Sequence, residues 1–234
     1  MGRDVGVTAA DRVTFADWAD AASVRLAGDA SARRYARLTR GGHSVILMDD
    51  PAGETRQFAR LARHLRALGL SAPAILAEDH ANGRLLIEDL GDRLVARVAT
   101  DAATEARLYA RATDVLVALH RHAPPPGLVR ATPDHLAAQI APAYTHYAAD
   151  PDGTAAAADA LRPILATQAA GAPVMVLRDY HAENILDLPD RAGPAAAGLL
   201  DFQDALAGHP AYDLASLIRD ARRDLHPGTA EACI

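Results

Sequence analysis

The sequence predicts an α+β fold in two parts, with a small β-sheet and one packed helix in residues 1–91 and mainly helices in residues 92–234. In the first part, short apolar runs rich in β-branched side chains alternate with turn signals, which is typical of strands. After Gly91, apolar side chains recur almost throughout at helical spacing. Half of the 234 residues are hydrophobic, so the chain can bury a sizeable core and is not a disordered sequence.

Local patterns predict each element of the first part. Phe15 and Trp18 lie at helical spacing and predict a short amphipathic helix over residues 11–22, with Trp18 in the core. A stripe of apolar side chains opposite arginines predicts a helix over residues 54–68, which Gly69 can end. Strands are predicted over residues 23–26, 33–38, 45–48, 73–77 and 84–87.

The turn between the first two strands begins at Gly28 and continues through Asp29 and Ser31. A turn led by glycine can bring backbone N–H groups close to phosphate oxygens. Most such turns are plain hairpins, so the pattern alone leaves both interpretations open.

Helical periodicity accounts for most of the second part. A long amphipathic helix is predicted over residues 102–122, and the run of prolines at 124–126 ends it. Two more helices are predicted over residues 133–149 and 155–169, separated by the turn at 150–153.

Composition excludes several classes of protein. The formal net charge of −6 argues against a general nucleic-acid binder. Cys233 is the single cysteine, so neither a disulfide within one chain nor a cysteine metal cluster can form. The absence of an apolar signal and of a run of membrane-spanning length predicts a cytoplasmic protein without a membrane partner. The sequence contains no lysine, so a cationic side chain that contacts phosphate must be Arg or His.

The stretch from 174 to 204 contains the residues best suited to chemistry. An apolar run leads into Asp179, Asn184 follows after a short loop, and a second apolar run ends at Asp201. Phosphoryl transfer needs a carboxylate that orients or deprotonates the attacking hydroxyl, and oxygen ligands that hold Mg²⁺ against the phosphates. Asp179 and Asn184 taken singly could equally shape turns, but the ordered set of three favours a phosphotransferase site.

The motifs in this stretch resemble those of a known superfamily. Residues 178–184 have the pattern R-D-x-x-x-x-N, and residues 200–202 are L-D-F. Both resemble the catalytic and metal-binding loops of the aminoglycoside and choline phosphotransferase superfamily. More narrowly, R-D-Y-H-x-x-N with L-D-F-Q-D-A, and G-D-A-S-x-R-R-Y at residues 28–35, resemble the bacterial cell-wall sugar kinases. The resemblance extends from about residue 18 to 223 and implies a protein-kinase-like bilobal fold, with an antiparallel β-sheet in the N-lobe and a helical C-lobe.

The resemblance implies a role for particular side chains. Asp179 is expected to be the base, with Arg178 pairing with nearby acids to fix the loop, and Asn184 and Asp201 are expected to hold Mg²⁺. The remaining expected site residues are Gly28, Asp29, Ser31, Arg33 and Arg34 at the phosphates, Glu88 and Leu90 at the adenine through the hinge backbone, and Tyr180, His181 and Asp204 beside the sugar.

The phosphate contact departs from the usual family pattern. Met48 stands where related kinases have a lysine that pairs with the phosphates. We expect Arg33 or Arg34 to replace that lysine, and only one of the two can point inward because side chains alternate along a strand. Both could also be solvated charges. Glu54, where the helix begins, is a possible partner for the inward arginine.

Three further features bear on the large lobe. Leu177 occupies the position of a common histidine before the Arg-Asp pair, which puts the usual hydrogen bonding of the loop in question. Asp213 resembles the buried Asp that braces the catalytic loop, although it could equally cap a helix. The sequence ends soon after Arg223, where typical members continue, so a shortened C-lobe is expected.

The sequence therefore predicts an ATP- and Mg²⁺-dependent kinase whose substrate is the anomeric hydroxyl of N-acetylmuramate or N-acetylglucosamine, in peptidoglycan recycling. One alternative keeps the reaction and makes an aminoglycoside or another small alcohol the acceptor. Another alternative is an inactive nucleotide-binding scaffold, which the missing lysine favours and the retained Asp179, Asn184 and Asp201 oppose. The expected partners are the nucleotide and a small sugar, and the oligomeric state stays open.

Overall fold

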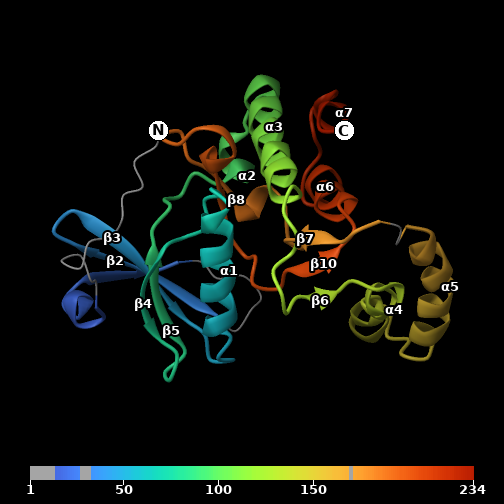
Figure 1. The fold of residues 1–234 in the computed structure, drawn as a ribbon, viewed down its shortest axis with the longest axis horizontal. Helices are drawn as coiled ribbons and strands as arrows, with labels where there is room; N and C mark the ends of the chain where they lie inside the picture. Colours follow the sequence, from blue (N-terminus) through green and yellow to red (C-terminus); the bar gives the residue numbers. More distant parts are fainter. Residues whose placement is uncertain (1–13, 27–32, 169–170) are drawn as a thin grey trace.

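A computed structural model describes residues 14–26, 33–168 and 171–234. The predicted α+β fold is confirmed: a five-stranded antiparallel sheet with one packed helix is followed by a mainly helical part (Figure 1). The last strand of the sheet ends at Glu88 and the next helix begins at Val95, while a domain boundary near Gly91 stays a prediction. In the described residues, no helix is both long enough and apolar enough to cross a membrane.

The N-terminal sheet has the strand order β1-β2-β3-β5-β4. The alternation of side chains gives it two apolar faces: Met48 and Leu85 pack in the main core on the side of helix α1, and Val45 and Leu86 lie in a second cluster with Trp18. Its strands agree with the predicted ones within a few residues, and their bounds are β1 Ala22–Arg25, β2 Arg34–Arg40, β3 His43–Asp49, β4 Ile75–Asp79 and β5 Arg84–Glu88.

The predicted helix over residues 11–22 is wrong in its described portion. Only a short 3-10 helix, η2, forms at Ala16–Trp18, and β1 already begins at Ala22. Phe15 and Trp18 pack on the second apolar cluster of the sheet, and β1 pairs along its whole length with β2. Strand pairing and burial on the sheet therefore outweigh the helical spacing of two aromatic side chains.

Helix α1, Thr55–Ala67, covers one face of the sheet and lies between it and the helical part (Figure 1). Its buried side chains include Phe58, Leu61 and Leu65, as the apolar stripe predicts. The Asp50 carboxylate accepts hydrogen bonds from backbone N–H groups at the start of the helix. Gly69 ends it, with a φ of +80° that glycine adopts without strain.

The second part is mainly helical with two small sheets, ordered β6-β10-β7 and β8-β9. Helix α3 is buried along one side. The elements are α2 Val95–Val98, α3 Ala102–Leu119, β6 Val129–Arg130, α4 Pro133–Ala138, η3 Ala143–Tyr147, α5 Gly153–Gln168, β7 Val174–Val176, η4 Ala182–Asn184, β8 Ile185–Asp187, η5 Gly193–Ala196, β9 Ala197–Leu199, β10 Leu206–Gly208, α6 Ala211–Ile218 and α7 Thr229–Ala232.

One predicted helix of this part is broken. Residues 133–149 form the short α4 and a separate π-helical turn, η3, instead of one continuous helix. Pro142 lies between the two, and a proline inside a helix removes one hydrogen bond and collides with the preceding turn. The helices predicted over 102–122 and 155–169 are confirmed as α3 and α5.

Packing of α1 joins the sheet to the catalytic stretch. The ring of Phe58 lies against the ring of Phe202, with centroids 4.9 Å apart. Close by, the Gln57 amide donates to the backbone carbonyl of Gln203 at 3.2 Å. These contacts set the position of the segment after β9 relative to the sheet.

Where the sheet meets the second part, the Glu88 carboxylate joins the two. It accepts hydrogen bonds from Arg66 at 3.1 Å, from Arg191 at 2.6 Å and from the backbone N–H of Ala74 at 3.0 Å. Arg66 belongs to α1 and Arg191 to the loop between β8 and β9. One acidic side chain at the end of β5 therefore links three segments distant in sequence.

The C-terminal segment is attached to α3 through Glu105, whose side chain is fully buried. Its carboxylate pairs with Arg223 at 3.0 Å and accepts hydrogen bonds from the backbone N–H of His226 at 2.7 Å and the hydroxyl of Thr229 at 2.9 Å. Every bond reaches across more than 110 residues of chain.

We expect Glu105→Ala to lower the free energy of unfolding by about 3 kcal/mol, because it leaves three donors without their buried acceptor. Urea denaturation measures this change, and limited proteolysis should show earlier cleavage of the C-terminal segment. Glu231→Ala, an exposed acid in the same region, is the matched control and should change stability by no more than about 0.5 kcal/mol. Equal stability of the two variants would contradict this role for Glu105.

Candidate active site

The backbone of the catalytic loop is held by Asp213. This Asp lies in the first turn of α6 with no exposed surface, and its carboxylate accepts hydrogen bonds from the backbone N–H of Leu177 at 2.6 Å and of Arg178 at 2.9 Å. The bracing expected of Asp213 is confirmed. It does not depend on a side chain at position 177, where Leu177 is buried in the core. Arg178 has a φ of +77°, a conformation that is costly for a non-glycine residue and marks a constrained site.

The next turn joins Asp179 to Asn184. The Asn184 amide nitrogen donates to the backbone carbonyl of Asp179 at 3.0 Å and lies 3.3 Å from Nε2 of His181. No hydrogen bond to the Asn184 amide oxygen is found among the described residues. The nitrogen end is therefore used to hold the loop, and the oxygen end is available to a cation.

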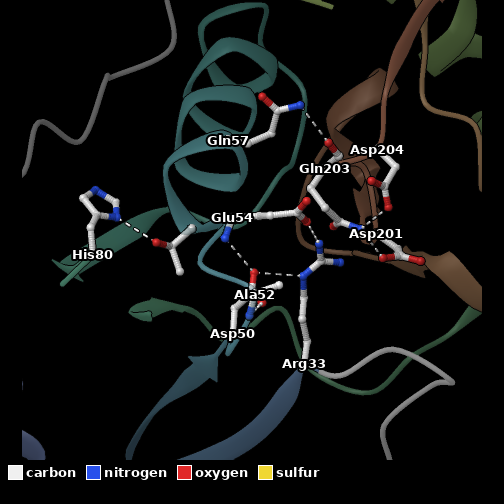
Figure 2. A network of polar contacts seen from close by, with 10 residues as sticks. Arg33, Asp50, Ala52, Glu54, Gln57, His80, Asp201, Gln203 and Asp204 are labelled. Carbon is white, nitrogen blue, oxygen red and sulfur yellow. Dashed lines mark hydrogen bonds and ion pairs between the residues drawn. The ribbon is translucent and has the colours of Figure 1, made fainter. Parts of the chain in front are cut away.

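The third member of the set, Asp201, follows β9 and has a φ of +53°. The amide nitrogen of Gln203 donates to Asp201 at 2.7 Å and to Asp204 at 3.2 Å (Figure 2). Because one NH₂ group bonds to both carboxylates, the two acids are held side by side. Gln203 is 2% exposed, so this bridge is protected from solvent.

Charge interactions place these acids near Asp179. Burial raises the pKa of Asp179 above its usual range, Arg178 lowers it, and the negative charges of Asp201 and Asp204 raise it further. Three carboxylates from two segments of the chain therefore share one electrostatic environment.

The donors present fit a small hard cation completed by a ligand. Among the described residues, no group of three or more His, Cys, Asp or Glu side chains could hold a metal by itself. Mg²⁺ commonly takes one or two protein carboxylates together with water and substrate phosphates. Asn184 and Asp201 supply oxygens of that kind, and no third protein ligand is required.

Arg33 points to the same region from the sheet. Its guanidinium pairs with Glu54 at 2.6 Å and with Asp50 at 3.3 Å (Figure 2), and its side chain is 9% exposed. Burial would lower its pKa, but the bond to Asp50 and the charges of Asp50 and Asp204 raise it overall. The predicted pairing of Glu54 with an inward arginine is confirmed.

Arg34 faces the other way, as strand alternation requires. Its side chain is 57% exposed and pairs with Asp49 on the outer face of the sheet at 3.1 Å. Met48 is fully buried in the core, so no charge stands at the position of the usual lysine.

Several expected site residues lie elsewhere. Tyr180 is 2% exposed and donates its hydroxyl to the backbone carbonyl of Ala112, so it belongs to the core and its expected place beside the sugar is wrong. No ion pair within 4 Å joins Arg178 to an acid in the described segments, which corrects the expected pairing. His181 is also mostly buried but stays within the loop, where its Nε2 lies 3.3 Å from the Asn184 amide nitrogen, and its Nδ1 has no partner among the described residues.

The two residues expected at the adenine, Glu88 and Leu90, differ in the hydrogen bonds that they make. The Glu88 carboxylate is used in the network with Arg66 and Arg191. At Leu90, no hydrogen bond to the backbone N–H or carbonyl is found within the described residues, which leaves both groups available to a base. Gly28, Asp29 and Ser31 fall outside the described residues.

Two residues of the site were not singled out from the sequence. Asp50 accepts hydrogen bonds from the backbone N–H groups of Ala52 and Glu54 just before α1, and it pairs with Arg33. An Asp shortly before a helix start is the local signal that could have indicated it. Gln203 stands in the sequence only as one position of the L-D-F-Q-D-A motif. Nothing in its spacing indicates that its amide would join two carboxylates.

Residues 23–233 match the phosphotransferase enzyme family, APH. An N-acetylmuramate/N-acetylglucosamine kinase of Caulobacter vibrioides is 39% identical over 254 positions, which cover 89% of this chain and 70% of that protein. A kinase of the same name from Pseudomonas aeruginosa is 32% identical over 85% of this chain and 60% of that protein. The chain thus spans about 60% to 70% of the length of these relatives.

Solved structures with the same fold include an aminoglycoside-3'-phosphotransferase of type VIII, with a TM-score of 0.67, 16% identity and coverage of 93% of this chain and 86% of that one. Another is the aminoglycoside phosphotransferase APH(3'')-Id from Streptomyces rimosus in complex with ADP and streptomycin, with a TM-score of 0.66, 19% identity and coverage of 93% and 85%. At these identities the likeness shows the fold alone. The match over nearly the whole sequence, with the two close relatives, shows that this chain belongs to the phosphotransferase enzyme family.

Proposed function

We propose that this protein transfers the γ-phosphoryl group of Mg²⁺·ATP to the anomeric hydroxyl of N-acetylmuramate or N-acetylglucosamine. The observation that carries the proposal is the convergence of Asp179, Asn184 and Asp201 beside an inward arginine, on the fold of a phosphotransferase family. The two relatives named as kinases of these sugars supply the acceptor. A cytoplasmic role in cell-wall sugar recycling, with no nucleic-acid partner, accords with this reaction.

In the proposed reaction, Asp179 accepts a hydrogen bond from the sugar hydroxyl and takes its proton as the bond to phosphorus forms. Burial and the nearby negative charges raise the pKa of Asp179, which makes its carboxylate a better proton acceptor than an ordinary aspartate. Asp213 keeps the backbone at Leu177 and Arg178 in place, so the position of the carboxylate does not depend on substrate. No covalent enzyme intermediate is required.

Asn184 and Asp201 would hold Mg²⁺ through the free amide oxygen and the carboxylate. When bound, the ion neutralises charge on the phosphate oxygens. Gln203 orients Asp201 by donating to one of its oxygens, and the same amide holds Asp204 beside it. Asp204 then stands at the edge of the site, where it can accept a hydrogen bond from the nucleotide or the sugar.

Arg33 takes the place of the missing lysine in this proposal. Arg33 pairs with Glu54 at the start of α1, just as the phosphate-binding lysine of protein kinases pairs with a glutamate of a helix. The guanidinium comes from the residue before β2, whereas Met48 lies in β3 and is buried in the core. This arrangement supports an active kinase over an inactive scaffold, since the guanidinium of Arg33 is held in place by Glu54 and Asp50 and would supply the cation for phosphate.

The proposal is tested by incubating the protein with Mg²⁺·ATP and a panel of N-acetylmuramate, N-acetylglucosamine and aminoglycosides, following ADP and sugar phosphate. Phosphorylation of either amino sugar at the anomeric position supports it. Turnover of aminoglycosides alone would favour the antibiotic kinase, and nucleotide binding without any turnover would favour the scaffold.

Asp179→Asn should lower kcat by about 100-fold or more while the KM values for ATP and sugar change little, because the amide cannot accept the proton. Steady-state kinetics measure both parameters. Asp190→Asn, which changes an exposed carboxylate after β8, is the matched control and should keep wild-type kinetics. An active Asp179→Asn variant would remove Asp179 from the mechanism.

Arg33→Ala should weaken nucleotide binding about tenfold or more, since a charge-assisted contact to phosphate is lost. Arg34→Ala, at the next residue along the chain, should leave it unchanged because Arg34 faces outward. Calorimetric titration with ADP and melting temperatures separate binding from folding. Arg33→Lys keeps a charge beside Asp50 and should bind with intermediate affinity, and an unchanged affinity in all three variants would refute the assignment.

Asp213 makes stability depend on pH in a defined window. Burial raises its pKa from 3.8 to about 6 in the folded protein, against the two backbone hydrogen bonds that lower it. The folded state therefore binds more protons than the unfolded state between these values, and stability falls as pH rises through them. A rise in the pKa from 3.8 to about 6 corresponds to about 3 kcal/mol.

As the pH rises from 4 to 6.5, the wild type should lose up to about 3 kcal/mol of stability that Asp213→Asn does not lose, because the variant has no carboxyl to ionise. The difference in the free energy of unfolding between the two should therefore change by that amount in favour of the variant. Urea denaturation across this range measures the difference. The variant should also lose activity at every pH, since an amide cannot accept both backbone bonds. A difference in stability that stays flat with pH would contradict the raised pKa.

A further inference from the structure

A pocket of about 250 Å³ lies in the helical part, between the sheet β6-β10-β7 and the helices α4, α5 and α6. Figure 1 shows α4 and α5 beside this sheet, on the side away from α1. Its wall includes Arg130 and Thr132 after β6, Leu165 of α5, and His209 and Tyr212 around the start of α6. Ligand pockets commonly measure about 300–1,000 Å³, so this one suits a single sugar ring rather than an oligosaccharide.

Two strands connect the pocket to the catalytic residues. β7 runs from Pro173, which lines the pocket, to the Arg178–Asp179 loop. β10 runs in the opposite direction, from the segment that contains Asp204 to the pocket wall at His209.

Tyr212 provides an independent link between pocket and loop. Burial raises the pKa of its phenol, Arg178 lowers it, and the negative charge of Asp179 raises it further, which places this pocket-lining side chain within the field of both catalytic-loop residues. The next residue, Asp213, bonds directly to the loop backbone. Tyr212 and Asp213 therefore connect the pocket wall to the catalytic loop, and an acceptor held in the pocket would extend its hydroxyl toward Asp179 from this side.

The permanent charge on the described wall of the pocket is positive. Among the described residues that line the pocket there is no Asp or Glu, and Arg130 carries the one permanent charge. Arg130 is exposed, and no acidic side chain pairs with it in the described segments. Asp134, the nearest acid along the chain, is paired with Arg162 instead. A cationic acceptor has no partner in this wall, whereas a carboxylate has an unpaired guanidinium.

We infer that this pocket receives the acceptor sugar and that Arg130 binds the carboxylate of N-acetylmuramate, so that Arg130 distinguishes the anionic from the neutral amino sugar. The inference rests on the proposed function and deepens it. A planar guanidinium matches a carboxylate with two parallel hydrogen bonds, which a neutral N-acetyl sugar cannot form. Since Arg130 is exposed, solvent screens the pair and the expected discrimination is modest.

The test compares kinetics on the two sugars. Arg130→Ala should raise KM for N-acetylmuramate about tenfold and leave kcat and the KM for N-acetylglucosamine unchanged. Arg130→Lys should give an intermediate KM for N-acetylmuramate. Arg121→Ala, an exposed arginine after α3 that does not line the pocket, is the matched control and should behave as wild type with both sugars.

Ionic strength gives a second readout. Added salt should raise KM for N-acetylmuramate in the wild-type enzyme more than in Arg130→Ala, because the variant has lost the screened pair. Melting temperatures of all variants show that a kinetic change is not a loss of folding.

The outcomes separate the two proposals. If the wild-type protein phosphorylates both sugars but Arg130→Ala changes neither KM, or raises both equally, the role of Arg130 is refuted and the kinase activity stands. Turnover of N-acetylglucosamine without any of N-acetylmuramate also refutes the role of Arg130 alone. If the wild-type protein phosphorylates neither sugar, the proposed function fails and the inference that rests on it fails too.

Discussion

The site depends on the buried hydrogen bonds between the Asp213 carboxylate and the backbone N–H groups of Leu177 and Arg178. They hold Arg178 at a positive φ, a conformation that an isolated chain would rarely adopt. Because the next residue is Asp179, this constraint directs the carboxylate that the proposed chemistry uses. A carboxylate without exposed surface is costly to bury, and here the cost is offset by two backbone donors and accompanied by a raised pKa.

A second constraint comes from α1, which connects the sheet to the segment after β9. Phe58 packs on Phe202, and Arg33 pairs with Glu54 where the helix begins. The cation beside the acidic cluster is therefore held by the same helix that positions Asp201 through Phe202. In the proposed site, Arg33 supplies the charge that related kinases take from a lysine, while Met48, at the position of that lysine, is fully buried in the core.

Sequence patterns predicted the larger features well because those features are local. Strand alternation assigned Arg33 and Arg34 to opposite faces, and the apolar stripe of α1 predicted its buried side. Predictions failed where a distant contact overrode a local preference. Pairing of β1 with β2 replaced the expected helix around Trp18, and the carbonyl of Ala112, 68 residues away, drew the Tyr180 hydroxyl into the core.

The sequence by itself determined which chemical groups are available: a loop carboxylate, an amide, a strand-end carboxylate, and arginines in place of any lysine. Only the tertiary structure decided their partners and orientation. Asp50 joins Arg33, Gln203 joins Asp201 to Asp204, and a pocket forms between the sheet β6-β10-β7 and the helices α4, α5 and α6. The physical reason is that spacing along the chain defines the face of an element, whereas burial, hydrogen bonding and charge pairing depend on what another segment brings against that face.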